Sequence, residues 1–210
     1  MENKYSVLIV AGPSGVGKTA VAKAIIEHNP RFTFLRSATT RPKRGDAHDD
    51  EYLYCTEDEF RGLISRGEML EHMVYDGNMY GTPKSEVERA HREGQVPLLV
   101  LDLKGVDSLY NNPLCHACAV FLYADDATVN SRLSGREGST PEKVASRKQR
   151  NIEDYRRLSA LAYAFYALIP NVATLNECRD AVLATFGDFE AGKPRSASVD
   201  GIVAEITEGK

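Results

Sequence analysis

The sequence predicts an α/β fold in which a parallel sheet is flanked by helices. Short apolar runs rich in β-branched residues alternate with stretches of helical periodicity along most of the 210 residues. Such alternation is typical of parallel sheets that are covered by helices on both faces. Hydrophobic residues make up 42% of the chain, which is enough for one domain with a sizeable core.

The predicted core strands are short and apolar. We expect them over residues 5–12, 31–39, 96–103, 118–124 and 165–170, the last one closed by Pro170. Helices are expected between them, including 18–28, 125–133 and 141–163. Thr140 and Pro141 are residue types favoured where a helix begins, and they precede the third of these helices.

Residues 39–85 interrupt the alternation and predict a small inserted β/α subdomain, called here the insert. It contains the strand-like "DEYLYC", a helix whose Thr56 and Glu59 have capping-box spacing, and a hairpin signal at Asp76–Gly77–Asn78. A polar loop at 134–141 between two helices predicts a helical lid over about 125–160. The predicted organisation is one domain over 1–190, with a core of 1–38 and 86–190, followed by a polar tail at 191–210 that we expect to be mobile.

Residues Gly12 to Thr19, "GPSGVGKT", fit the pattern GxxxxGK[ST] between a buried strand and a helix, and are called here the P-loop. In this context backbone N–H groups surround a phosphate chain at the positive end of the helix. Lys18 is expected to reach the outer phosphates and the Thr19 hydroxyl to hold Mg²⁺. The motif indicates that a nucleoside triphosphate binds, and leaves the acceptor of its phosphoryl group open.

A basic turn, "TTRPKRG" at 39–45, suggests a second anion. Arg41, Lys43 and Arg44 are concentrated there although the whole chain has a net charge of −4. The turn follows the second predicted strand, and ligands of open parallel sheets lie beyond the carboxyl ends of the strands. We therefore expect the turn to face the P-loop site.

The order of several motifs resembles that of guanylate kinases, a family that transfers phosphate from ATP to GMP. The motifs are "GPSGVGKT", "S-x-T-T-R-x-x-R-G" from Ser37, "EYLY", "MLEH", "GNMYGT", "LDLKG" and "RLSGR", and the resemblance covers about residues 5–190. It implies the three-layer P-loop fold, with the insert as the nucleoside monophosphate site.

The resemblance also implies a role for each matching residue. The GMP phosphate would be held by Ser37, Arg41, Arg44, Tyr52 and Tyr80, and guanine would be read by Glu71, Thr82 and Asp102. ATP would be bound by Gly12, Pro13, Ser14, Gly15, Val16, Gly17, Lys18, Thr19, Ala20 and Asn171. The implied catalytic cations are Lys18, Arg44, Arg132, Arg136 and Arg147, and the implied cofactor is Mg²⁺ at Thr19.

The chemistry of these residue types supports that assignment independently. Two arginines and two tyrosine hydroxyls suit one dianionic phosphate. Guanine offers donors at N1 and at its 2-amino group, so carboxylates can accept from both, whereas adenine would leave a buried carboxylate unpaired. A general base is not required, because the oxygen of a nucleotide phosphate is already ionised.

Three departures from the family pattern concern the ATP side. Val100 replaces the first Asp of "DxDxxG", Ala20 replaces a hydroxyl residue after the P-loop, and "FYALIPNV" at 165–172 has Tyr166 where the family has an Asp. These changes put the catalytic rate and the donor preference in question.

Other interpretations stay open. One is a guanylate-kinase-like binding module without catalysis, against which the intact P-loop argues. A second is a kinase of another small phosphorylated acceptor, such as ribose 1,5-bisphosphate, while nothing resembles the "NKxD" motif of a GTPase. Cys115 and Cys118 form a CxxC pair without the second ligand pair that a zinc site needs.

Composition and charge exclude several kinds of partner. The net acidic charge argues against a broad nucleic-acid surface, and no apolar run is long enough to span a membrane. The N-terminus has no signal-peptide pattern, so a cytoplasmic location is expected. Composition thus favours small ligands, and the resemblance implies that these are GMP and ATP.

Overall fold

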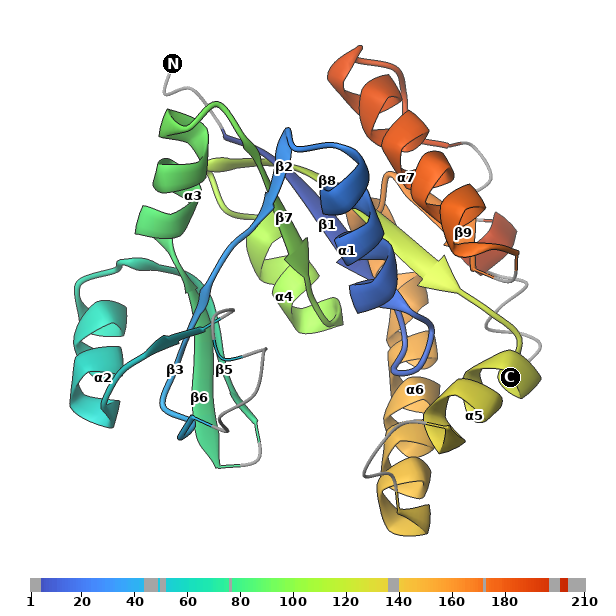
Figure 1. The fold of residues 1–210 in the computed structure, drawn as a ribbon, viewed down its shortest axis with the longest axis horizontal. Helices are drawn as coiled ribbons and strands as arrows, with labels where there is room; N and C mark the ends of the chain where they lie inside the picture. Colours follow the sequence, from blue (N-terminus) through green and yellow to red (C-terminus); the bar gives the residue numbers. More distant parts are fainter. Residues whose placement is uncertain are drawn as a thin grey trace.

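The structure is a computed structural model that describes residues 5–43, 49, 52–75, 77–135, 140–171, 173–196 and 201–203. Within these ranges, only the backbone is described for Tyr75, Asp126 and Lys143. Over these residues the strands form two sheets, a larger one in the core and a smaller one in the insert. Figure 1 shows the insert and the lid helices on opposite sides of the end of the core sheet that carries the P-loop.

The core sheet is parallel and has the strand order β2-β7-β1-β8-β9. Its strands are β1 (Tyr5–Ala11), β2 (Phe32–Phe34), β7 (Val96–Val100), β8 (Cys115–Tyr123) and β9 (Ala167–Pro170). The helices are α1 (Lys18–His28), α3 (Lys84–Arg92), α4 (Leu103–Tyr110), α5 (Asp126–Ser134), α6 (Pro141–Leu161), the 3-10 turn η2 (Ala162–Ala164) and α7 (Leu175–Glu190). This arrangement confirms the predicted α/β fold.

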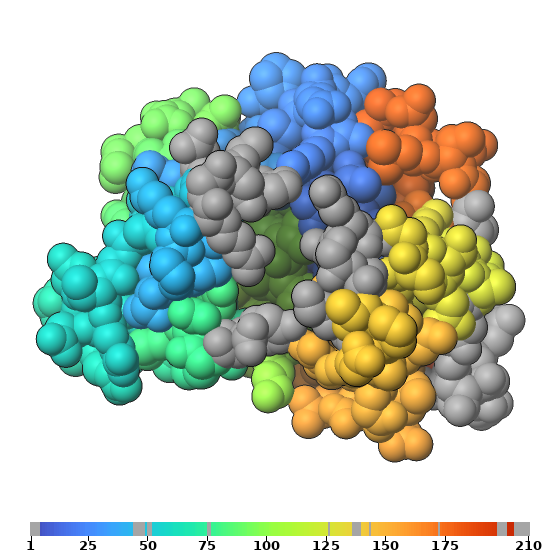
Figure 2. Space-filling model, turned by 60° about the horizontal axis from the view of Figure 1, so that its bottom comes forward, coloured from blue at the N-terminus to red at the C-terminus, as the bar shows by residue number. Residues whose placement is uncertain are grey.

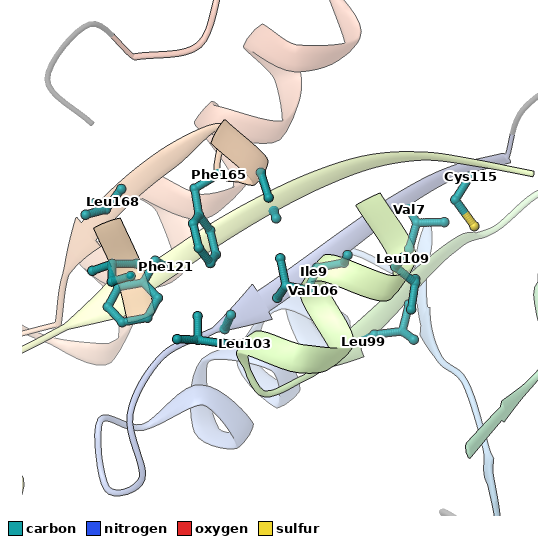
Figure 3. Close-up of a cluster of buried hydrophobic side chains, with 14 of the residues drawn as sticks. Val7, Ile9, Leu99, Leu103, Val106, Leu109, Cys115, Phe121, Phe165 and Leu168 are labelled. Atoms are coloured by element: carbon teal, nitrogen blue, oxygen red, sulfur yellow. The ribbon is translucent and has the colours of Figure 1, made fainter. Parts of the chain in front are cut away.

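Successive residues of β1 point to opposite faces of the sheet, and each face has its own core. Val7 and Ile9 pack with α4 and α6, as the close-up in Figure 3 shows for the α4 side. Leu8 and Val10 pack instead with α1 and α7. Both cores consist of side chains that exclude water, so the sheet is a rigid base for the loops at its carboxyl end.

The insert has a mixed sheet in the order β4-β3-β6-β5. It is formed by β3 (Ser37–Thr39), β4 (Tyr52–Tyr54), β5 (Met69–Tyr75) and β6 (Asn78–Pro83), with α2 (Glu57–Ser65) packed on it. Phe60 of α2 is fully buried against Ala38 and Met69, which gives the insert a small core of its own. The predicted capping box is present, since Thr56 accepts from the Glu59 N–H and the Glu59 carboxylate accepts from the Thr56 N–H.

The prediction of one strand over 31–39 is wrong, because the structure has two short strands there that belong to different sheets. Residues Phe32–Phe34 pair with β7 in the core, whereas Ser37–Thr39 pair with β4 and β6 in the insert. Leu35 and Arg36 cross between the two sheets. Arg36 donates there to Glu86 at 2.8 Å, and Glu86 is 4% exposed near the start of α3, where the chain returns to the core.

Part of the C-terminal tail lies against the domain, unlike the mobile tail that the sequence predicts. The Ser196 N–H donates to the carbonyl of Tyr166 at 3.0 Å, and Val203 is 4% exposed in the core on the α6 face. The apolar residues of "GIVAEI" that are described are helical, where the sequence allowed an edge strand. None of the described helices is both long and apolar enough to cross a lipid bilayer.

Candidate nucleotide-binding site

The P-loop joins β1 to α1, as its motif requires, and two of its glycines have no room for a side chain. A Cβ on Gly12 would lie 2.3 Å from the Leu122 carbonyl oxygen, and one on Gly17 would lie 2.7 Å from Asn171 Nδ2. Both residues also have positive φ angles, +143° and +102°. The loop therefore takes this path only with glycine at these positions.

Lys18 and Thr19 occupy the first turn of α1, at its positive end. The Lys18 ammonium donates to the carbonyls of Gly12 at 2.7 Å and Pro13 at 3.0 Å, so it lies over the loop. Thr19 is exposed and lines a pocket that also contains Ser37, Tyr52 and Thr82 of the insert. The P-loop and the insert thus border one continuous region.

Two residues predicted for the ATP site contact the outside of the P-loop in this structure. Asn171 is 4% exposed and its Nδ2 donates to the Val16 carbonyl at 2.6 Å. Arg132 of α5 donates to the same carbonyl at 3.0 Å and to the Asn171 carbonyl at 3.2 Å. These contacts fix the shape of the loop, and they leave neither side chain lying over the loop as a closed lid would.

The basic turn enters a cluster of tyrosines on the insert. Arg41 is 7% exposed, donates to the Tyr54 hydroxyl at 3.0 Å and has its guanidinium 4.9 Å from the centre of the Tyr52 ring. The Tyr52 and Tyr80 rings are 6.2 Å apart. An ion pair with Asp49 at 3.4 Å completes the environment of Arg41.

Sequence reasoning chose Tyr52 and missed Tyr54 and Asp49. The available signal was the alternation of β4, which places both tyrosines on one face of the strand. Ser37 is paired in register with Tyr52. Arg44, the other predicted phosphate ligand of this turn, lies outside the described residues.

The three residues predicted to read guanine come from the insert and the core. Glu71 of β5 is opposite Thr82 of β6, and the Thr82 hydroxyl donates to its Oε1 at 2.7 Å. Burial raises the pKa of Glu71 above its ordinary value, and the negative charge of Asp102 raises it further, against the Thr82 hydrogen bond. Glu71 therefore lies near enough to Asp102 for the negative charge of Asp102 to act on it.

Asp102 has a structural task as well. It is the N-cap of α4, where its Oδ1 accepts from the Gly105 N–H at 2.9 Å. The side chain is exposed and lines a second pocket together with Lys18 and Arg147. The predicted strand over 96–103 consequently ends at Val100, before the cap.

The second pocket lies between the P-loop, α4, α6 and the β5 strand. Figure 2 shows the molecule hollowed between the insert and the lid helices. Arg147 of α6 lines this pocket, and its Nη1 is buried without a hydrogen-bond partner among the described residues. A guanidinium that lines a pocket beside the P-loop is suited to an anion. Arg136, the other predicted arginine of the lid loop, lies outside the described residues.

Two further residues of α6 were missed by sequence reasoning. Asn151 is buried against Ser14 of the P-loop, and the pKa of Asp154 is raised to about 6 by burial and by the charge of Asp102. Both line the second pocket. The signal was their spacing, since positions four and seven after Arg147 share one face of a helix.

The metal assignment depends on Thr19 alone. No group of three or more His, Cys, Asp or Glu side chains arranged to hold a metal occurs in the described part of the chain. Mg²⁺ in phosphoryl-transfer sites is usually held by one or two protein ligands together with phosphates and water. An exposed hydroxyl in the first turn of α1 fits that mode of binding.

Comparisons with known proteins agree with the geometry. Residues 4–177 match the family model described as guanylate kinase. The guanylate kinase of Ruegeria pomeroyi is 34% identical over 164 residues, which are 77% of this chain and 76% of that protein. The guanylate kinase of Lactococcus lactis is also 34% identical, over 78% of this chain and 80% of that protein.

A solved structure shows the same fold. The crystal structure of guanylate kinase from Anaplasma phagocytophilum superimposes with a TM-score of 0.63 at 21% sequence identity, covering 97% of this chain and 95% of that one. The family match spans most of the sequence, including the P-loop, the insert and the lid helices. The chain therefore belongs to the guanylate kinase family.

Proposed function

We propose that this chain transfers the γ-phosphoryl group of ATP to GMP, giving ADP and GDP. The observation that carries the proposal is the placement of two carboxylates. Glu71 accepts from Thr82, which lines a pocket with Thr19 of the P-loop, and Asp102 lines a pocket with Lys18. The Oε1 of Glu71 accepts from the Thr82 hydroxyl, and burial together with the charge of Asp102 makes the ionised form of Glu71 costly without a ligand. A ligand that brings hydrogen-bond donors would relieve that cost.

Guanine has the donors that this pair requires. Its N1–H and 2-amino group can donate to carboxylate oxygens, whereas adenine presents an acceptor at N1 and has no 2-amino group. Thr82 fixes the orientation of Glu71 by donating to Oε1, which leaves Oε2 for the base. Recognition by an oriented, partly buried carboxylate discriminates strongly against a base that cannot pair with it.

The phosphate of GMP is assigned to the region around Arg41 and Tyr52. Arg41 is held by aromatic rings and by the Tyr54 hydroxyl, so it is already ordered before a ligand binds. Ser37 lies in register with Tyr52 on the neighbouring strand. In the same proposal Arg44 donates to this phosphate as well.

The transfer itself is an in-line displacement. An ionised oxygen of the GMP phosphate attacks the γ-phosphorus, and the bond from that phosphorus to the bridging oxygen of ATP breaks, so that both electrons remain on ADP. Lys18 and Arg147 line one pocket, and in this proposal they supply positive charge around the moving group. We assign Arg136 to the same task.

Mg²⁺ would be held by the Thr19 hydroxyl. When bound, it would neutralise part of the charge on the phosphates of ATP. Val100 lines the pocket near Thr19 and has no carboxylate to order the water around the ion. We therefore expect weaker Mg²⁺ binding in this chain than in a family member with an Asp at that position.

The test is ADP formation from ATP and Mg²⁺ with GMP, dGMP, IMP, AMP, CMP, UMP or ribose 1,5-bisphosphate as acceptor. Turnover with GMP and dGMP only, and a lower rate with IMP, would support the proposal, since IMP lacks the 2-amino group. Turnover with ribose 1,5-bisphosphate and not with GMP would contradict it. Binding of GMP without turnover by any acceptor would favour a binding module.

A further inference from the structure

Asn151 is a buried amide on the lid helix α6 that forms two hydrogen bonds with one residue of the P-loop. Its Oδ1 accepts from the Ser14 N–H at 2.7 Å, and its Nδ2 donates to the Ser14 carbonyl at 2.9 Å. The two residues are 137 positions apart in the chain. Asn151 is 6% exposed, so water does not compete for these bonds.

Only a carboxamide can form hydrogen bonds with both the backbone N–H and the backbone C=O of Ser14 from this position. It carries a donor and an acceptor on neighbouring atoms, in the spacing of the backbone N–H and C=O. A carboxylate of the same shape has no donor for the Ser14 carbonyl, and an alanine leaves both backbone groups without these partners. The pairing is therefore specific in chemistry as well as in shape.

The pairing joins the two cations expected at the transferred phosphoryl group. Arg147 is four residues before Asn151, one turn away on the same face of α6. Ser14 is four residues before Lys18 in the P-loop. Arg147, Asn151, Ser14 and Lys18 all line the pocket between the P-loop and α6.

We propose that Asn151 is a positioning residue that sets the lid helix against the P-loop, so that Arg147 and Lys18 face the same phosphoryl group. This inference rests on the proposed function. Arg147 lines the pocket that Lys18 also lines, and its Nη1 has no hydrogen-bond partner among the described residues, so the guanidinium retains a donor for a ligand. A donor fixed in advance stabilises a transition state without the cost of reorganisation.

A purely structural role for Asn151 makes a different prediction. Loss of two buried hydrogen bonds would then lower the melting temperature and leave the turnover number of the folded enzyme unchanged. A positioning role instead lowers kcat, because small displacements of a catalytic group are costly. KM for GMP should stay within about twofold, since Glu71 and the tyrosine cluster lie on the insert.

The experiment compares Asn151→Ala and Asn151→Leu with the wild type and with Gln149→Ala. Gln149 is the matched control, a carboxamide on the same helix whose side chain is exposed. We expect kcat to fall by about 10- to 100-fold in both Asn151 variants and to stay at the wild-type value in the control. A kcat of Asn151→Leu equal to that of the wild type would overturn the proposal, because leucine occupies the space of the asparagine side chain and forms no hydrogen bonds.

A double-mutant cycle tests whether Asn151 acts through Arg147. If it does, Asn151→Ala should cost less than about threefold in kcat when Arg147 is already alanine, because the group it positions is gone. Independent, multiplicative effects of the two substitutions would contradict the inference.

A third measurement does not depend on the acceptor. Hydrogen exchange of the amides at 12–19 should be faster in Asn151→Ala than in the wild type, both free and with a non-hydrolysable ATP analogue. Unchanged exchange there would refute the tether even if the chain proved inactive on GMP. If exchange is faster in Asn151→Ala and the wild type has no GMP kinase activity, the proposed function is refuted and the tether stands.

Discussion

Replacing Glu71 by glutamine should remove most of the preference for guanine. The side chain keeps its shape and its hydrogen bond with Thr82, since an amide oxygen can still accept from the hydroxyl that now lies 2.7 Å away. The other terminal atom becomes an NH₂ group. That group would face the N1–H and 2-amino donors of guanine, and two donors cannot form a hydrogen bond with each other.

The expected loss follows from the bond that is removed. A hydrogen bond to an ionised acceptor contributes about 1.5–3 kcal/mol, and placing two donors face to face leaves both unsatisfied. A cost of about 2–3 kcal/mol corresponds to a decrease of about 30- to 150-fold in kcat/KM for GMP. Activity with AMP should rise slightly, because the new NH₂ can donate to adenine N1.

The pH dependence gives a second readout of the same residue. Burial and the neighbouring Asp102 raise the pKa of Glu71 above its ordinary value of 4.5. As the pH falls through that raised pKa, the carboxylate is protonated and loses its ability to accept from guanine. The acid limb of kcat/KM for GMP should therefore be shallower in Glu71→Gln than in the wild type.

The assay is ADP release with GMP, IMP and AMP as acceptors, from pH 5 to 8. The matched control is Glu68→Gln, the same chemical change three residues away, where the side chain is 49% exposed and paired with Arg66. Glu68→Gln should behave as the wild type. An unchanged ratio of GMP to AMP activity in Glu71→Gln would refute the role of Glu71 in reading the base.

Three further substitutions test other parts of the structure. Gly17→Ala would place a Cβ 2.7 Å from Asn171 Nδ2 at a φ of +102°. We expect the variant to lose about 1–3 kcal/mol of stability and to bind a non-hydrolysable ATP analogue at least tenfold more weakly; binding equal to the wild type would contradict this. Burial alone would raise the pKa of Glu86, but hydrogen bonds from Arg36 and a second arginine lower it to about 2. Glu86→Gln should therefore cost about 1–2 kcal/mol at pH 7 after allowance for the exposure of Arg36, and this difference, measured by urea unfolding, should shrink as the pH falls from 4.5 towards 2. The pKa of Asp154 is raised to about 6, so the wild type gains stability as the pH falls from 6 to 4. Asp154→Asn should therefore be more stable than the wild type by about 1 kcal/mol at pH 7 and as stable as the wild type below pH 4. A variant less stable than the wild type at pH 7 would count against this reasoning.

Local sequence patterns were sufficient for most of the core. The P-loop, the helix after it and the apolar strands each depend on residues that are close in the chain, and β1 and α1 fall within one residue of the predicted bounds. The capping box of α2 is likewise a property of four consecutive residues. Such features could be predicted because their causes are local.

The division of residues 31–39 between two sheets could not be predicted in this way. All of these residues favour strands, and β-propensity does not say which sheet a strand will join. The division is decided by partners far along the chain, with Phe32 beside Val96 in the core and Ser37 beside Tyr52 in the insert. Arg36 then lies at the crossing, where Glu86 holds it.

The resemblance to the family named the residues expected at the site and did not predict what each of them contacts. Arg132 and Asn171 were expected at the bound ATP, and here both donate to the carbonyl of Val16. Asn151 belongs to none of the motifs, and only its spacing from Arg147 indicated that both residues lie on the same face of α6. Each of these contacts joins residues more than 100 positions apart.

These contacts explain why a loop of small residues can act as a rigid site. A glycine-rich loop loses much conformational entropy when it is ordered, so its shape has to be stabilised from outside. Here Asn171 and Arg132 hold Val16 from the side of β9 and α5, while Asn151 holds Ser14 from α6. Because two of these residues belong to the lid helices, a movement of the lid changes the support of the P-loop. If α5 and α6 move when ATP binds, as the lid hypothesis expects, that movement and the geometry of phosphate binding would be coupled through the backbone of the loop itself.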